Sequence, residues 1–183
     1  MTALRLLLAF GCVSSWAALA APQVGKALPA ARLAGDDGGL VNGQAWTSGS
    51  MRGKVRVLFY VDPDEKEQNE HVGQAIQKAN LDKEFYGSVA VINMGATWLP
   101  NFAVARSLKS KQAQYPRTVY VKDINKSLVK RWGLADDGYD VIVFDAEGMV
   151  RFYGMGKLSQ AQTQTVVRLL AEGVAAAKAK PAE

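Results

Sequence analysis

The sequence predicts an α/β fold in which helices flank a central mixed β-sheet with an N-terminal β-hairpin extension. Residues 55–61 follow a glycine and are mostly apolar strand formers, which is typical of a strand buried on both faces of a parallel sheet. A helix-start signature comes directly after this run, and a second strand is predicted at 88–93. Strand formers also flank the acidic turn 146–148, which predicts a β-hairpin.

The first twenty residues, 1–20, are typical of a secretory signal. Arg5 supplies the positive start, residues 6–16 form an apolar core, and Ala18-Leu19-Ala20 has the small-x-small pattern of a cleavage site. We expect cleavage after Ala20 and export of the remaining chain. Removing Arg5 and no acidic residue lowers the formal net charge from +5 to +4.

The single cysteine of the chain, Cys12, lies within this leader. A competing interpretation makes Cys12 the lipidated first residue of a lipoprotein, but Ala9 and Phe10 fit a lipidation motif poorly. A chain cleaved after Ala20 has no thiol. Thiol-disulfide exchange and cysteine peroxidase chemistry are therefore excluded for it.

The exported part is long enough for one domain, and it shows no repeat or linker. We expect a single domain over 21–175 and a disordered tail over 176–183, where Ala, Lys and Pro dominate. Glycine, asparagine and proline interrupt the long uncharged stretch 85–105, so we expect no transmembrane segment.

The elements follow in chain order. Short apolar runs on each side of the acidic, glycine-rich corner 35–39 predict the N-terminal β-hairpin. Asp62, Pro63 and Glu65 stand at the N-cap, first and third helical positions, and they predict a helix. We expect this helix to run to about Ala79. The remaining predictions are a strand at 88–93, a helix at 101–111, a strand at 118–122, a helix at 126–132, hairpin strands at 140–145 and 149–153, and a last helix that begins at the capping pair Ser159 and Gln162.

This order of elements matches a thioredoxin-like topology with a right-handed crossover between the parallel strands. Val24-Gly25-Lys26 to Pro29, residues 53–58 and the Asp-x-x-Gly end of 141–148 resemble exported thioredoxin-like reductases and peroxiredoxins. More closely, 53–58, Tyr115-Pro116, the region of Trp132 and 141–148 resemble the YtfJ family of small bacterial periplasmic proteins. That resemblance implies a signal peptide, a periplasmic location, a thioredoxin-like fold, and no established activity or assigned catalytic residue. Some records loosely describe the family as a transcriptional regulator.

Thioredoxin-fold enzymes carry C-x-x-C directly after the strand that corresponds to 55–61, and here 62–67 reads Asp-Pro-Asp-Glu-Lys-Glu. Aligned by strand end, Asp64 and Glu67 stand where the two thiols would be, and Tyr139 stands near the position of the cis-proline. These three residues define a candidate site at the lost redox motif. An acid–base or metal pair is one interpretation, but a helix N-terminus attracts carboxylates through its unpaired N–H groups, which favours a structural role.

Two other groups could bind a metal. His71 and Glu67 lie four residues apart, but two ligands on one helix make a poor transition-metal site, and a solvated or partly packed histidine is favoured. Asp136, Asp137 and Asp140 lack the alternating acids and the distal glutamate of a calcium loop, and turn chemistry explains them better. We expect no metal and no cofactor.

A basic segment, residues 106–131, holds eight Lys and Arg residues against one Asp. If these side chains share a face, they could meet an acidic protein, a lipid headgroup or nucleic acid, although a solvated surface is favoured and export argues against nucleic acid. The candidate residues of this basic surface are Lys109, Lys111, Lys126, Lys130 and Arg131.

Residues 97–102 form an apolar loop for which we weigh a partner-binding patch against capping of the core. Capping is favoured, and Trp46, Trp98 and Trp132 are interpreted as packing residues. The leading hypothesis is a periplasmic, non-redox thioredoxin-like protein that acts by binding, for example to an envelope protein. The alternatives are an envelope enzyme that uses carboxylates with a divalent cation and, ranked last, a DNA-binding regulator.

Overall fold

The computed structural model describes residues 21–180. The strands are β1 (Arg32–Leu33), β2 (Gly38–Leu40), β3 (Trp46–Thr47), β4 (Val55–Val61), β5 (Tyr86–Asn93), β6 (Thr118–Asp123), β7 (Tyr139–Phe144) and β8 (Val150–Met155). The α-helices are α1 (Glu70–Lys78), α2 (Asn101–Gln114), α3 (Ser127–Trp132) and α4 (Gln160–Ala179), and short 3₁₀ helices span Gly35–Asp37, Ser48–Met51 and Pro63–Glu65.

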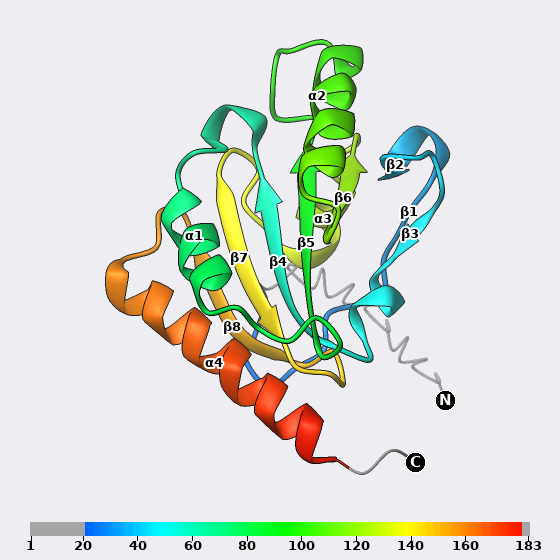
Figure 1. Cartoon of the computed structure of the whole chain (residues 1–183). Helices are drawn as coiled ribbons and strands as arrows, with labels where there is room; N and C mark the ends of the chain where they lie inside the picture. The colour runs from blue at the N-terminus through cyan, green and yellow to red at the C-terminus, as the bar shows by residue number, and fades with distance from the viewer. Residues whose placement is uncertain (1–20, 181–183) are drawn as a thin grey trace, which may run out of the picture.

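A six-stranded mixed sheet in the order β2-β6-β5-β4-β7-β8 forms the centre of the molecule (Figure 1). Strands β4, β5 and β6 are parallel, whereas β7, β8 and β2 each run antiparallel to their neighbours. Strands β1 and β3 form a separate two-stranded ribbon. The mixed sheet and the hairpin β7–β8 confirm the predicted fold class.

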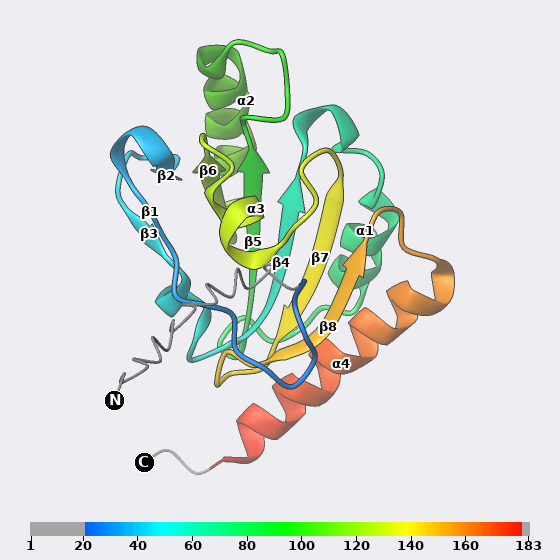
Figure 2. The ribbon, with the colours of Figure 1, turned by 180° about the vertical axis from the view of Figure 1, so that it is seen from behind.

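Helices cover both faces of the sheet, with α1, α2 and α4 on one face and α3 on the other (Figures 1 and 2). Val72 of α1, Val104 of α2 and Val166 of α4 belong to one buried apolar cluster. Leu128 of α3 belongs to the second cluster, together with Trp46 of the β1–β3 ribbon. The sheet therefore lies between two apolar layers.

The strongest sequence predictions are confirmed at residue level. Along β4, Val57 belongs to one buried cluster and Leu58 to the other, as expected for a strand buried on both faces. At the start of α4, the Ser159 hydroxyl accepts from the Gln162 N–H, and the Ser159 N–H donates to the Gln162 side chain. This is the reciprocal capping box that the sequence predicts.

The predicted N-terminal β-hairpin is wrong in its pairing. Strand β1 pairs with β3, whereas β2 joins the central sheet beside β6, with Gly38 opposite Asp123. Gly38 has φ 122°, and a Cβ built on it would lie 1.9 Å from the Lys122 carbonyl oxygen. Only glycine permits this approach of the two backbones, so the glycine-rich corner makes a sheet edge instead of a simple hairpin turn.

The predicted helix over 62–79 is also shorter than expected. The chain forms the 3₁₀ helix Pro63–Glu65 and a turn, and α1 begins only at Glu70. Asn69 has non-helical backbone angles, and its side chain is bonded to Gly156 and Leu158 in the loop after β8. This tertiary contact sets the beginning of α1, and local sequence does not reveal it.

At the other end, α4 continues to Ala179, past residue 175 where we expect the domain to end, because its alanines are strong helix formers. The leader 1–20, its cleavage site and Cys12 lie outside the described residues, as does 181–183. Among the helices of the described part, none has the length and apolar character needed to cross a membrane.

Candidate functional site

The parallel strands β4 and β5 end at the same edge of the sheet, since Val61 is in register with Ile92. Two connections leave this edge, residues 62–69 and 94–100, and Figure 1 shows both at the same end of the molecule. In a thioredoxin-like fold the segment after β4 is the place of the redox motif. We call this edge the strand-end surface.

Asp62 closes the end of β4. It is buried, its carboxylate accepts from the Asp64 N–H at 2.9 Å, and its own N–H donates to the Gly138 carbonyl at 2.9 Å. Burial raises the pKa of Asp62, and the hydrogen bond from the Asp64 N–H opposes that shift. Asp62 is therefore a structural cap of the 3₁₀ helix, at the N-cap position that the sequence predicts.

The three residues of the lost redox motif are not brought together. Asp64 and Glu67 are exposed, and within residues 21–180 neither side chain makes a hydrogen bond or ion pair. Tyr139 is buried at the start of β7, opposite Val61, and its ring lies edge-on to Phe59 with centroids 6.0 Å apart. Burial raises the pKa of Tyr139, so its phenol stays neutral. The tyrosine packs in the core, whereas the two carboxylates are exposed to solvent.

His71 is partly packed, which is one of the two environments that the sequence favours. Its Nε2 lies 2.9 Å from the Leu158 carbonyl oxygen and donates to it. The neighbouring Asn69 donates to the Gly156 carbonyl and accepts from the Leu158 N–H, both at 2.9 Å. His71 and Asn69 therefore attach α1 to the loop before α4.

Two carboxylates of the acidic loop, Asp136 and Asp140, also have structural partners, whereas Asp137 is exposed. Asp136 forms an ion pair with Lys126 at 2.6 Å. Asp140 is buried, accepts from the Ala135 N–H and the Tyr153 hydroxyl at 2.9 Å each, and has its pKa raised by burial. In the part of the chain that the structure describes, no three His, Cys, Asp or Glu residues are grouped to hold a metal ion.

A row of buried polar side chains on the α3 face of the sheet is not predicted from the sequence. The Tyr60 hydroxyl donates to Asp123 at 3.0 Å, and Asp123 also accepts from two N–H groups at the start of α3 at 2.8 Å. Asn93 of β5 donates to the Asp136 carbonyl at 2.6 Å. Burial and the Asp123 carboxylate raise the pKa of Tyr60. A run of mostly apolar strand residues carries no signal for this network.

An aromatic surface lies beside the acidic turn at the strand-end surface. It consists of Trp98, Leu99 and Phe102, which we call the aromatic tip. Trp98 is 85% exposed and Phe102 is 77% exposed, so the prediction that this corner caps the core is wrong. Trp46 and Trp132 are buried as expected and pack edge-on, with centroids 6.2 Å apart.

The basic candidates fall on two faces. Helix α2 packs on one face of the sheet through Val104 and Leu108, and α3 packs on the opposite face through Leu128 and Trp132 (Figures 1 and 2). A single basic patch across both helices is therefore not formed. Lys109 and Lys111 belong to α2, whereas Lys126, Lys130 and Arg131 lie directly before or within α3.

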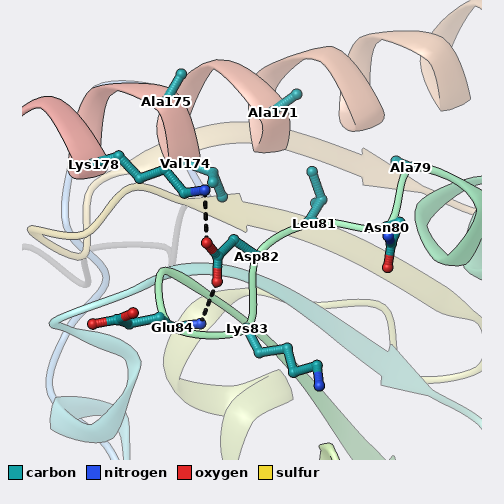
Figure 3. A pocket seen from close by; sticks show the side chains of 10 residues that line it. All are labelled: Ala79, Asn80, Leu81, Asp82, Lys83, Glu84, Ala171, Val174, Ala175 and Lys178. Carbon is teal, nitrogen blue, oxygen red and sulfur yellow. Dashed lines mark hydrogen bonds and ion pairs between the residues drawn. The ribbon is translucent and has the colours of Figure 1, made fainter.

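A depression of about 710 Å³ lies between residues 79–84 and α4 (Figure 3). It is shallow and open, and the ion pair between Lys178 and Asp82 (2.6 Å) crosses it. Lys178 also lies 5.8 Å from the centroid of the Phe85 ring. The depression is near the start of β5, at the opposite end of that strand from the aromatic tip, and it contains no residue of the predicted sites.

The model of a family described as "Bacterial protein of unknown function (YtfJ_HI0045)" matches residues 33–173. The chain belongs to this family. Its similarity to "Uncharacterized protein YtfJ" of Escherichia coli (strain K12) is 30% identity over 131 residues, 69% of this chain and 71% of that protein. An "Uncharacterized protein" of Haemophilus influenzae is 28% identical over 130 residues, with the same coverage. The YtfJ resemblance is thereby confirmed.

Solved structures show the same fold as this YtfJ-family chain. A thiol peroxidase from Chromobacterium violaceum has a TM-score of 0.60 at 14% identity, over 84% of this chain and 89% of that one. The pneumococcal exposed lipoprotein thioredoxin Etrx1 of Streptococcus pneumoniae strain TIGR4 has a TM-score of 0.55 at 15% identity, over 79% and 99%. At such identities the likeness concerns the fold alone, and it confirms the thioredoxin-like class.

Proposed function

We propose that this YtfJ-family chain is a periplasmic binding protein that uses a thioredoxin-like fold without thiol chemistry. The observation that carries the proposal is the aromatic tip: Trp98 and Phe102 are 85% and 77% exposed at the strand-end surface. Aromatic side chains are strong contributors to interfaces because they bury a large apolar area with few rotatable bonds. A tip of this kind is suited to contact with a partner.

The chemistry of the strand-end surface supports binding in preference to catalysis. Asp62 follows β4 directly and is used as a cap. Asp64 and Glu67 are exposed to water, and Tyr139 is in the core. A general acid or base works best when its environment sets its pKa and a partner group orients it. Neither exposed carboxylate has such an orienting partner among residues 21–180.

The periplasmic location rests on the signal-like segment 1–20 and on the resemblance to small periplasmic proteins. The single cysteine, Cys12, lies within that segment, so an exported chain cleaved after Ala20 would have no thiol. A binding role is compatible with both features, because it needs a stable surface and no redox group.

Site-specific photo-crosslinking in living cells tests the proposal. A photoreactive amino acid is placed at Trp98, at Glu67 in the acidic turn, and at the exposed Arg168 on α4 as control. We expect an adduct of discrete mass, with either a protein or a lipid, from position 98 and none from position 168. An adduct from position 67 alone would move the binding site to the lost redox motif. No adduct from any position would contradict a binding role for this surface.

A further inference from the structure

The solvent-facing ridge of α2 continues the aromatic tip. Phe102, Arg106 and Lys109 are spaced four and three residues apart, so they lie along one stripe of the helix, and all three are exposed. The opposite stripe carries Val104 and Leu108, which are buried against the sheet. We call the stripe of Phe102, Arg106 and Lys109 the α2 ridge.

The chain segment that contains the ridge carries cations and no carboxylate. Between Phe85 and Lys122 the sequence contains no Asp or Glu. Within the described residues, neither Arg106 nor Lys109 forms an ion pair or hydrogen bond through its side chain. No direct ion pair therefore neutralises either side chain, and both are open to an anionic partner. The exposed carboxylates Asp64 and Glu67 belong to the neighbouring connection after β4, and they are not part of the ridge.

We propose that the aromatic tip and the α2 ridge dock this protein onto a bilayer that contains anionic phospholipids. The inference rests on the proposed binding function and deepens it by naming the partner. Tryptophan and phenylalanine settle at the boundary between headgroups and acyl chains, while arginine and lysine pair with the lipid phosphates. The α2 ridge provides these two kinds of side chain in series, with the aromatic residue at the first turn.

The shape of this region favours a bilayer over a folded protein. Figures 1 and 2 show α2 and its preceding loop projecting beyond the ends of the strands. A protruding tip can enter the soft headgroup layer without a complementary groove, whereas protein interfaces at their cores require close shape complementarity. Since we expect an exported chain, a membrane surface would border the compartment in which it works.

The test mixes protein purified from the periplasm with lipid vesicles and measures binding. Anionic vesicles of phosphatidylethanolamine and phosphatidylglycerol are compared with vesicles of phosphatidylcholine alone. Of the tryptophans in the described part, Trp98 is exposed, whereas Trp46 and Trp132 are 2% and 1% exposed. A change in tryptophan fluorescence on vesicle binding therefore reports on Trp98 at the aromatic tip. We expect flotation with the anionic vesicles, a blue shift of tryptophan emission, and protection from acrylamide quenching. Binding should weaken as salt shortens the screening length.

Two charge-reversal variants provide the matched comparison. R106E/K109E changes the α2 ridge, and K130E/R131E makes the same charge change on α3, on the opposite face of the sheet. We expect at least a tenfold loss of vesicle affinity for R106E/K109E and less than a twofold change for K130E/R131E. Circular dichroism checks that both variants are folded, and F102A replaces R106E/K109E if that variant is not.

The possible failures have different consequences. Equal loss of vesicle binding in both charge-reversal variants would mean unspecific attraction and would overturn the inference. No binding to anionic vesicles, together with a protein adduct from position 98, would overturn the lipid partner and leave the proposed binding function standing. No binding to vesicles and no adduct would overturn both.

Discussion

Asn69, the residue before α1, joins that helix to the loop after β8. It is buried, donates to the Gly156 carbonyl and accepts from the Leu158 N–H at 2.9 Å each. Asn69→Ala leaves both backbone groups without this partner, and we expect a loss of roughly 2 to 4 kcal/mol in the free energy of unfolding. Urea unfolding followed by circular dichroism measures it.

The exposed Asn101→Ala is the control, and we expect a change within about 0.5 kcal/mol. Equal stability of the two variants would show that the contacts of Asn69 do not hold α1 in place.

Asp140 predicts a dependence of stability on pH. Burial raises its pKa in the folded protein above the usual value of 3.8. The folded state thus holds this proton more tightly than the unfolded chain does. The stabilisation is complete below the unfolded pKa and is lost as pH rises through the folded pKa. We expect Asp140→Asn to flatten the decline in unfolding free energy as pH is raised from about 4 towards 7.

The measurement is urea unfolding of wild type and Asp140→Asn at several pH values, with the exposed Asp137→Asn as control. An unchanged pH profile for Asp140→Asn would mean that this buried carboxylate does not titrate in that window.

At the scale of elements, two glycines within helices have different surroundings: Gly73 has open space beside it, and Gly173 is in close contact with a strand. Gly73 of α1 has no atom within 4 Å of the place where a Cβ would stand, whereas at Gly173 of α4 a Cβ would lie 3.0 and 3.1 Å from the two γ-methyl carbons of Val55. We expect Gly73→Ala to stabilise the protein by about 0.5 to 1 kcal/mol, because alanine lowers the entropy cost of the helix.

Gly173→Ala gains the same helix propensity but overpacks Val55, which is buried on β4. We expect a net destabilisation of up to about 2 kcal/mol, which Val55→Ala in the same chain should partly relieve. A double-mutant cycle in urea measures the coupling. Stabilisation by Gly173→Ala of the same size as by Gly73→Ala would show that α4 can move away from β4.

The sequence predicts those elements whose signals are local. The hydrophobic run of β4, the turn between β7 and β8, and the capping box of Ser159 and Gln162 each require only neighbouring residues. The pairing of β2 with β6 and the delayed start of α1 depend on contacts with residues far along the chain, at Asp123 and Leu158. Local propensity cannot supply such information.

In the candidate site, too, local features could be predicted from the sequence and long-range contacts could not. Placing the acidic turn after β4 needs only strand order, so the position of Asp64 and Glu67 could be predicted. The burial of Tyr139 and the exposure of Trp98 depend on which side chains cover each residue. Residue type alone predicts packing for Trp98, and this prediction is wrong. The division of the basic residues between α2 and α3 requires the two faces of the sheet to be known.

At the scale of the whole molecule, the two ends of β5 differ in character. At its carboxyl end lie a capped acidic turn, a buried polar row and the aromatic tip. Near its start is a shallow depression crossed by the ion pair of Lys178 and Asp82 (Figure 3). The features that suit binding therefore lie at the carboxyl end of β5. Elsewhere two apolar layers cover the faces of the sheet.

Thiol labelling tests the proposal that the chain is exported and loses its only cysteine by cleavage after Ala20. The sequence has one cysteine, Cys12, so protein processed after Ala20 should take up no iodoacetamide under denaturing conditions. Intact mass after labelling measures this, and protein retained in the cytoplasm with its leader serves as the positive control. Labelled or lipidated Cys12 in the periplasmic or membrane fraction would contradict cleavage after Ala20.

The most direct test of a binding function at the aromatic tip measures both crosslinking and stability of a variant that lacks the two aromatic side chains. A photoreactive residue at Leu99 is compared in cells between otherwise wild-type protein and W98A/F102A. We expect the wild-type background to give an adduct that W98A/F102A loses, while the unfolding free energy of the variant stays within about 0.5 kcal/mol because both side chains are exposed. An adduct that persists in W98A/F102A, or a variant that loses several kcal/mol of stability, would contradict the proposal that these aromatic residues serve binding rather than packing.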